Sequence, residues 1–280
     1  MTRTLCLARL LAVLLLTVCS AGQGYASPEQ DREAFISAYR ARIPDIPIES
    51  YVNGALMFSA DALAQFNSIM EFPPFQDDID RGRKLWEAPF RNGRAFADCF
   101  PDAGRAIAGN YPYYDSRSDK VVTFEMEINR CLRENGEAEF KFADKATMGT
   151  VTAYARTLSD GMRTNIKVEG QRALAKYERG KKLYFTRIGQ YNFACSSCHL
   201  VNAGKILRTE FLSPTVGQTT HWPVFRGGDN LNTLHMRYRR CMEQMRATPF
   251  PAGSEELNDL EYFQSYLSNG LPLRASVFRK

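Results

Sequence analysis

Long apolar runs are scarce in this sequence. Beyond the first 26 of its 280 residues, no stretch approaches the roughly 20 consecutive apolar residues that a membrane-spanning helix needs. Charge of one sign is scarce as well, because 36 lysines and arginines are balanced by 31 aspartates and glutamates. The formal net charge of +5 is too mild and too evenly spread for a nucleic-acid-binding surface. The sequence therefore predicts neither a membrane span nor a nucleic-acid partner.

The leucine-rich run of the chain lies at its N-terminus. Two arginines and the apolar residues 10–18 come first, and small residues ending in Gly24-Tyr25-Ala26 follow. A basic start, a short apolar centre and a small-x-small end are typical of a cleaved secretory signal peptide. A lipid anchor on Cys19 is the alternative, although the bulky Val18 precedes it where a small residue is usual. We expect a signal peptide over residues 1–26, cleaved near Ala26, and export from the cytoplasm.

The chain matches itself. Four places in the first half agree in order and roughly in spacing with four in the second: residues 80–87 with 178–186, Cys99 with Cys195, Cys131 with Cys241, and 158–161 with 267–270. The first pair reads DRGRKLWE and ERGKKLYFT. Agreement at four separated places is unlikely to be chance, so the sequence predicts a tandem duplication.

The spacing of apolar residues predicts mainly helical units. In residues 231–245, leucines, a tyrosine, a cysteine and methionines recur at three- and four-residue steps, after Asp229 and Asn230 as expected caps. Residues 254–267 repeat this pattern with glutamates in the first turn and Gly270 beyond the end. Residues 148–158 echo it in the first half.

Proline and glycine mark the expected breaks. Residues 72–75 and 213–228 are rich in these breakers and are predicted to be loops. The boundary between the two halves is expected near residues 161–170, and roughly 250 residues after the signal peptide suit two domains better than one. We therefore predict domains at residues 27–165 and 166–280.

A C-x-x-C-H motif, Cys195-Ser-Ser-Cys198-His199, lies in the second half. Its thiols can form thioethers to the vinyl groups of haem while the adjacent imidazole binds iron from the proximal side. A redox cysteine pair or half of a zinc site is the alternative, but no second pair of ligands lies nearby. Expected helices at residues 178–188 and 254–267 resemble the two terminal helices of a small cytochrome c domain. The sequence predicts one covalently bound haem c.

The first half lacks this motif. Residues 97–101 keep Cys99 but no histidine, so no c-type haem can be attached there. The half therefore resembles a degenerate cytochrome c domain without haem. The repeat places Cys99 and Cys131 near the pocket that haem would have occupied, and we predict a disulfide between them. Two buried free thiols are the alternative.

One cysteine remains, Cys241. A lone helical cysteine is usually a small core residue. Cys241 follows the haem motif and precedes the last helix, however, and cytochrome c domains commonly supply the distal iron ligand from this segment. Thiolate ligation of the iron is therefore predicted. Other residues compete for this position: Met236, Met242, Met245, His221 and His235.

Arg237 lies four residues before Cys241, so a helix places both side chains on one face. A guanidinium offers a fixed charge and a fork of donors suited to oxyanions, and it favours the thiolate of a neighbouring cysteine. Arg239, Arg240 and Arg246 are close in sequence. For Arg239 and Arg240, a solvated helix face is an equally good interpretation.

The combination resembles the SoxA family, the larger cytochrome subunits of SoxAX complexes in periplasmic sulfur oxidation. The duplicated layout, the motif at residues 195–199 and the segment RYRRCMEQMR at 237–246 carry the resemblance, which covers nearly the whole chain after the signal peptide. Among single- and two-haem forms the sequence resembles the single-haem form. Cys99 and Cys131 stand where a first haem and its ligand would be.

The resemblance implies an enzyme, L-cysteine S-thiosulfotransferase. It would join thiosulfate oxidatively to a cysteine of SoxY in the SoxYZ carrier and pass electrons through haem to the small cytochrome SoxX in the periplasm. In the family the cysteine matching Cys241 ligates iron and occurs as a persulfide, and the arginine matching Arg237 binds substrate. The alternatives are a plain electron-transfer cytochrome, or a haem-binding scaffold that holds SoxX.

Overall fold

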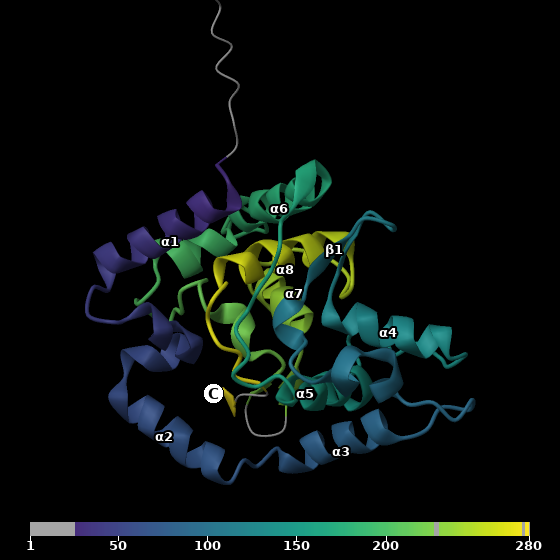
Figure 1. Ribbon diagram of the computed structural model, residues 1–280. Helices are drawn as coiled ribbons and strands as arrows, with labels where there is room; N and C mark the ends of the chain where they lie inside the picture. Colours follow the sequence, from purple (N-terminus) through teal and green to yellow (C-terminus); the bar gives the residue numbers. More distant parts are fainter. Residues whose placement is uncertain (1–25, 227–229, 276–277, 280) are drawn as a thin grey trace, which may run out of the picture.

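Helices dominate the computed structural model, which describes residues 26–226, 230–275 and 278–279 (Figure 1). The α-helices are α1 (Pro28–Arg42), α2 (Ala60–Glu71), α3 (Gln76–Glu87), α4 (Phe124–Glu134), α5 (Thr150–Thr157), α6 (Gly170–Phe185), α7 (Leu234–Gln244) and α8 (Glu255–Leu267). The prediction of a mainly α-helical fold is confirmed. The expected signal peptide lies almost wholly outside the described residues. Within them, no helix is long and apolar enough to cross a membrane.

Short helical turns and strands connect these helices. The turns are η1 (Ile48–Phe58), η2 (Phe96–Cys99), η3 (Pro101–Gly104), η4 (Ala108–Asn110), η5 (Lys145–Gly149), η6 (Ser197–Val201) and η7 (Gln218–His221). The strands are β1 (Tyr113–Asp115), β2 (Lys120–Val122), β3 (Ile206–Leu207), β4 (Glu210–Phe211), β5 (Val224–Arg226), β6 (Asn230–Asn232) and β7 (Phe278–Arg279). β1 pairs antiparallel with β2, as β3 does with β4. β5 lies between antiparallel β6 and parallel β7.

The same helix pair recurs in both halves, α3 with α5 and α6 with α8 (Figure 1). Each pair crosses at a glycine. A Cβ atom on Gly82 would lie 2.0 Å from the carbonyl oxygen of Thr150, and one on Gly180 would lie 1.9 Å from that of Asp259. Only a residue without a side chain permits such an approach. The two glycines occupy equivalent places in the matched segments, as a tandem duplication requires.

The repeat extends between these helix pairs. Cis peptide bonds precede Pro112 and Pro223, and each proline leads into a hairpin, β1–β2 or β5–β6. Each hairpin leads into a helix, α4 or α7, whose N-cap threonine accepts a hydrogen bond from the third residue beyond it. For Thr123 the donor is the backbone N–H of Met126, at 3.3 Å, and Thr233 makes the same contact at 3.4 Å.

The cap expected for α7 was wrong. Asn230 lies in β6, whose residues pair with β5 in an extended conformation that cannot continue into a helical turn. The chain turns three residues later, where the Thr233 side chain satisfies a free backbone N–H. The other expected cap, Asp229, lies outside the described residues. For α8 the expected cap, Ser254, is confirmed.

Other expected boundaries also shift. The helix expected at residues 178–188 is α6, which starts at Gly170 and ends at Phe185, because Thr186 is extended. The helix at 148–158 comprises the end of η5 and α5. The expected loop at 213–228 contains η7 and β5, whose three residues are too short for a periodic pattern. The expected loop at 72–75 is confirmed between α2 and α3.

Aromatic side chains fill the interior of the first half. The ring of Trp86 stacks on those of Phe96 and Phe100, with centroids 5.3 and 5.2 Å apart. Phe90 meets Phe96 edge to face at 5.0 Å. Such pairs add stabilisation beyond the area they bury. The first half thus builds its core from its own side chains.

A second cluster forms around α6 and α8, and it includes the N-terminal segment. Phe35 and Tyr39 of α1 are buried there with Tyr184 and Phe263. α1 lies alongside α8 (Figure 1), although most of both halves comes between them in sequence. The division of the chain between residues 165 and 166 stays a prediction.

The predicted disulfide between Cys99 and Cys131 is confirmed. It joins η2 to α4, and the side-chain amide of Asn135 donates to the Cys99 sulfur at 3.3 Å and to the Cys131 carbonyl at 2.8 Å. The disulfide therefore links η2, the segment that corresponds to the C-x-x-C-H motif of the second half, to α4, the helix that corresponds to α7.

Replacing both disulfide cysteines by serine is expected to lower the free energy of unfolding. The bond spans 32 residues, and closing such a loop is worth about 3–4 kcal/mol in the chain-entropy model. Urea unfolding of both proteins under non-reducing conditions measures the loss. The reduced wild type is the control, and its free energy of unfolding should equal that of the variant. Equal stability of oxidised and reduced wild type would contradict this prediction.

Candidate functional site

A cavity of about 910 Å³ brings together the site residues predicted from the sequence. Cys195, Cys198 and His199 line it from η6 and the residues just before it, and Arg237 and Cys241 line it from α7. Two segments about 40 residues apart in the chain therefore meet at one cavity, which cysteine, histidine and arginine residues line together.

His199 is oriented by its own loop. Its Nδ1 lies 2.8 Å from the carbonyl oxygen of Ser213, and the side-chain NH2 of Gln218 beside it donates to the Ser213 hydroxyl at 2.9 Å. A carbonyl can only accept, so Nδ1 carries the proton and Nε2 keeps its lone pair. Burial lowers the pKa of His199 to about 4, so the ring is neutral at pH 7. A neutral imidazole with a fixed outer hydrogen bond is what an iron ligand requires.

The N-terminal helix supports the same loop. The Tyr39 hydroxyl donates to the carbonyl oxygen of His199 at 2.7 Å and accepts from the backbone N–H of Thr215 at 2.9 Å. Burial raises the pKa of Tyr39, which keeps its proton available for this bond. Sequence reasoning missed Tyr39, Ser213 and Gln218. No local pattern marks Tyr39, which lies 160 residues from His199.

Cys241 lies close enough to the other two free thiols, Cys195 and Cys198, to affect their pKa values. Burial, with Cys241 nearby, raises the pKa of the Cys195 thiol to about 12. Burial and Cys241 also raise the pKa of Cys198, and the charge of Arg237 opposes this rise. Cys241 itself is half-buried. Its sulfur therefore belongs to the cavity and not to the packed side of α7.

The competing ligands of the iron divide into two groups. His235 is outside the cavity: its Nδ1 accepts from the backbone N–H of Gly253 at 3.0 Å, and its Nε2 lies 3.1 Å from a carboxylate oxygen of Glu261. The contacts of His235 are thus made outside the cavity. Met236 does not line the cavity either. The candidates that do line it, besides Cys241, are His221, Met242 and Met245.

The neighbouring arginines also separate. Arg240 points to solvent, with its side chain 67% exposed and 3.4 Å from Glu243, so the solvated-face interpretation holds for it. Arg239 does not line the cavity. Arg246 does, and its guanidinium lies 5.0 Å above the ring of Tyr191.

The residues present fit haem c. Two cysteines for thioether bonds, a neutral histidine held by its outer nitrogen and a large cavity occur together. In the described ranges, no group of three or more histidine, cysteine or acidic residues could hold a metal ion.

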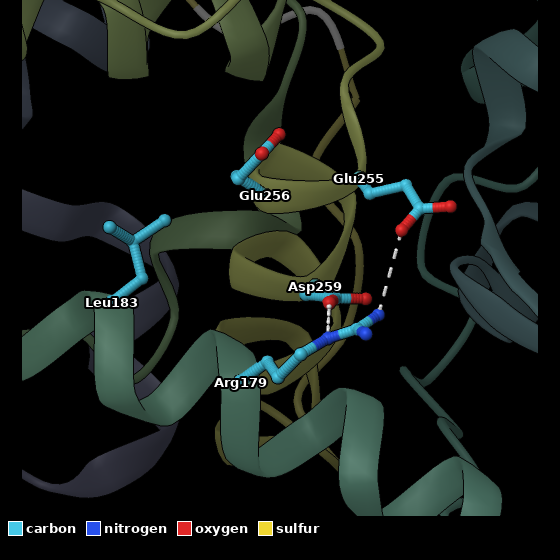
Figure 2. Close-up of a pocket in the computed structure, with 5 residues that line it drawn as sticks. All are labelled: Arg179, Leu183, Glu255, Glu256 and Asp259. Atoms are coloured by element: carbon cyan, nitrogen blue, oxygen red, sulfur yellow. Dashed lines mark hydrogen bonds and ion pairs between the residues drawn. The ribbon is translucent and has the colours of Figure 1, made fainter.

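A smaller cavity of about 220 Å³ lies where α6 crosses α8 (Figure 2). Arg179 donates to Asp259 at 2.7 Å and reaches Glu255 at 3.8 Å. Burial raises the pKa of Asp259 to about 6, against the effect of Arg179. None of the predicted site residues lines this cavity, and its polar groups pair across the helix crossing.

Comparison with known proteins places the chain. The family model of the SoxA/TsdA cytochrome c domain matches residues 81–164. The L-cysteine S-thiosulfotransferase subunit SoxA of Chlorobaculum tepidum is 41% identical over 253 residues, which cover 90% of this chain and 88% of that protein. The subunit of the same name from Allochromatium vinosum is 41% identical over 258 residues, 91% of each chain. The chain belongs to the SoxA family.

A solved structure agrees with the SoxA assignment. The crystal structure of SoxXA from P. pantotrophus matches with a TM-score of 0.68 at 30% identity, over 74% of this chain and 79% of that one. A cytochrome c domain implies covalently bound haem c, and the C-x-x-C-H motif of this chain begins at Cys195. The family model itself matches the half that lacks the motif.

Proposed function

We propose that this chain is the haem-bearing subunit of an L-cysteine S-thiosulfotransferase, which joins thiosulfate to a cysteine of SoxY in the SoxYZ carrier. One observation carries the proposal: Cys241 and Arg237 line the same cavity as the haem-attachment residues Cys195, Cys198 and His199. The names of the 41% identical relatives support the reaction class.

The net reaction is oxidative. The carrier thiol loses its proton, a sulfur–sulfur bond forms to the terminal sulfur of thiosulfate, and two electrons leave. Haem, when bound, supplies the redox centre that accepts electrons one at a time. We infer that SoxX receives them, since the matching crystal structure contains SoxX together with SoxA. We propose the periplasm as the site of the reaction, because the sequence predicts a cleaved signal peptide over residues 1–26.

Three residues of this chain have separate roles in the proposed reaction. With haem bound, Cys241 would be a ligand of the iron and the covalent relay: its thiolate would form a sulfur–sulfur bond to thiosulfate as two electrons leave, and the carrier thiolate would then displace Cys241. Arg237 neutralises the oxyanion one helical turn away. His199 would ligate the iron of a bound haem through Nε2, with its proton on Nδ1 toward Ser213.

One haem is proposed for the whole chain. Residues 97–101 offer no histidine, and aromatic side chains with the Cys99–Cys131 disulfide pack the first half. We therefore assign residues 27–165 to a degenerate domain without haem and residues 166–280 to the haem domain. Tyr39, in the degenerate domain, would stabilise the His199 loop of the haem domain.

The deciding experiment combines the SoxAX complex with reduced SoxYZ, thiosulfate and an electron acceptor. The mass of SoxY should increase by one thiosulfate, with two electrons delivered for each conjugate. A plain electron-transfer cytochrome would leave the mass of SoxY unchanged, and so would a scaffold.

Arg237→Gln is expected to lower kcat/KM for thiosulfate by about 100-fold, because a desolvated oxyanion loses its charged partner. Arg240→Gln removes the same charge from the exposed side of the same helix and should leave the rate within about twofold. Initial rates of conjugation measure both. Equal rates for the two variants would remove Arg237 from the proposal.

A further inference from the structure

Two segments meet at the rim of the large cavity: residues 189–193, just before the C-x-x-C-H motif, and the C-terminal end of α7. Gly189 has φ +71°, and a Cβ atom there would lie 2.1 Å from the carbonyl oxygen of Met245. The backbone N–H groups of Gln190 and Tyr191 donate to the carbonyls of Arg246 and Met245, each at 3.4 Å. The absence of a side chain at Gly189 thus allows the turn to lie against the helix end.

Arg246 is held at this rim in an unusual way. Its φ of +56° lies in the left-handed region, which non-glycine residues seldom adopt. Its guanidinium sits 5.0 Å above the Tyr191 ring and donates to the side-chain oxygen of Gln190 at 3.3 Å. Neither partner is a carboxylate. The contacts therefore fix the position of the cation without neutralising its charge.

The acidic residues of the rim have other partners. Glu210 pairs with Arg226 at 3.4 Å, and Glu243 pairs with Arg240 at 3.4 Å. In the part of the chain that the structure describes, no carboxylate lies within ion-pair distance of Arg246. Besides Arg226, the cavity is lined by Arg208, by Arg237 one turn before Cys241, and by Arg246 beyond it, an exposed residue held by two neutral partners.

We propose that Arg246, positioned by Tyr191 and Gln190, is a second anion-binding residue, which receives the second negative charge of thiosulfate as the dianion enters the cavity. This inference rests on the proposed function. Arg237 supplies one positive charge, and removing a dianion from water requires another. Together the two guanidiniums favour dianions over monoanions, because a monoanion would leave the charge of one guanidinium uncompensated.

The test uses the SoxAX complex with SoxYZ and compares Arg246→Gln with Arg240→Gln, which removes an equal charge from the same segment outside the cavity. Arg246→Gln should raise KM for thiosulfate about tenfold with kcat within about twofold, as expected for losing one charge-assisted contact. The difference should shrink near about 1 M salt, where the Debye length is only about 3 Å. Arg240→Gln should leave KM unchanged.

Tyr191→Leu separates positioning from charge. It keeps the guanidinium and removes the aromatic face beneath it, so KM for thiosulfate should increase about threefold, which corresponds to a cation–π contact of about 0.5–1 kcal/mol. Melting temperature and the absorption spectrum of the haem confirm that each variant is folded.

Two results would overturn the inference. Equal KM values for Arg246→Gln and Arg240→Gln would show that Arg246 does not contact the anion. A raised KM for SoxYZ with an unchanged KM for thiosulfate would make Arg246 a carrier contact instead. Calorimetric titration with sulfate, an unreactive dianion, tests the site without turnover. If the wild-type complex conjugates no thiosulfate, the proposed function fails. The anion site would still be supported if Arg246→Gln bound sulfate more weakly than both wild type and Arg240→Gln.

Discussion

Cys241→Ala is expected to abolish thiosulfate conjugation, with a loss of at least about 1,000-fold in kcat, typical of removing a covalent relay. The sulfur faces the cavity that Arg237 and His199 also line, so alanine leaves the anion site and the proximal side in place. Attachment of haem depends on Cys195 and Cys198 and should persist. Rates of conjugation to SoxYZ, with haem content measured on a denaturing gel, separate the two functions.

The variant should remain folded. Cys241 is half-buried, whereas the neighbours that anchor α7, Tyr238 and Met242, are buried in the core and are unchanged. Met245→Leu is the matched control, because Met245 also lines the cavity and is a competing ligand. It should retain the rate and the ligand spectrum of the iron. Full conjugation by a folded Cys241→Ala complex would end the covalent-relay hypothesis, and sulfur ligation lost only in Met245→Leu would make the methionine the ligand.

The candidate site could be predicted because its chemistry is local in sequence. The C-x-x-C-H motif occupies five consecutive residues, and Arg237 and Cys241 share one helical turn. The repeat, which pairs Cys99 with Cys195 and Cys131 with Cys241, led to the disulfide. Such patterns depend on spacing along the chain, so they can be recognised without a structure.

The supporting groups could not be predicted, because their contacts are distant in sequence. Tyr39 reaches the backbone of His199 across 160 residues, and α1 as a whole packs on α8. Hydrophobic periodicity can indicate that a helix buries one face, but it cannot name the partner of that face. The α7 cap was wrong for a related reason. Thr233 follows a strand of three residues, and strands this short show no alternation that would move the helix start.

The matched glycines show the same limit. Gly82 and Gly180 occupy equivalent positions of the repeat. The sequence alone, however, does not show that two helices are in contact at each of these glycines. In the structure the Cα atoms leave no room: the carbonyl carbon of Asp259 would lie 2.5 Å from a Cβ on Gly180, and that of Thr150 2.7 Å from one on Gly82. Backbone atoms within a helix cannot move aside as a flexible side chain can.

Gly180→Val is therefore expected to lower the free energy of unfolding by at least about 4 kcal/mol, because relieving the clash must push α6 away from α8. Leu260 and Gln264 of α8 line the large cavity, so the haem spectrum should broaden as well. Urea unfolding followed by circular dichroism measures the loss. Lys182→Val is the control, since it places the same β-branched residue at an exposed position of α6 and should cost under about 1 kcal/mol.

Gly82→Val tests whether the two halves use the same construction. The crossing of α3 and α5 is as close as that of α6 and α8, so the loss of stability should be similar. The haem spectrum should respond less, because α3 and α5 contribute no residue to the lining of the large cavity. If Gly82→Val and Gly180→Val both unfold within about 1 kcal/mol of Lys182→Val, the helices do not meet at these glycines. The duplication would then survive in the sequence but not in the packing that it is proposed to preserve.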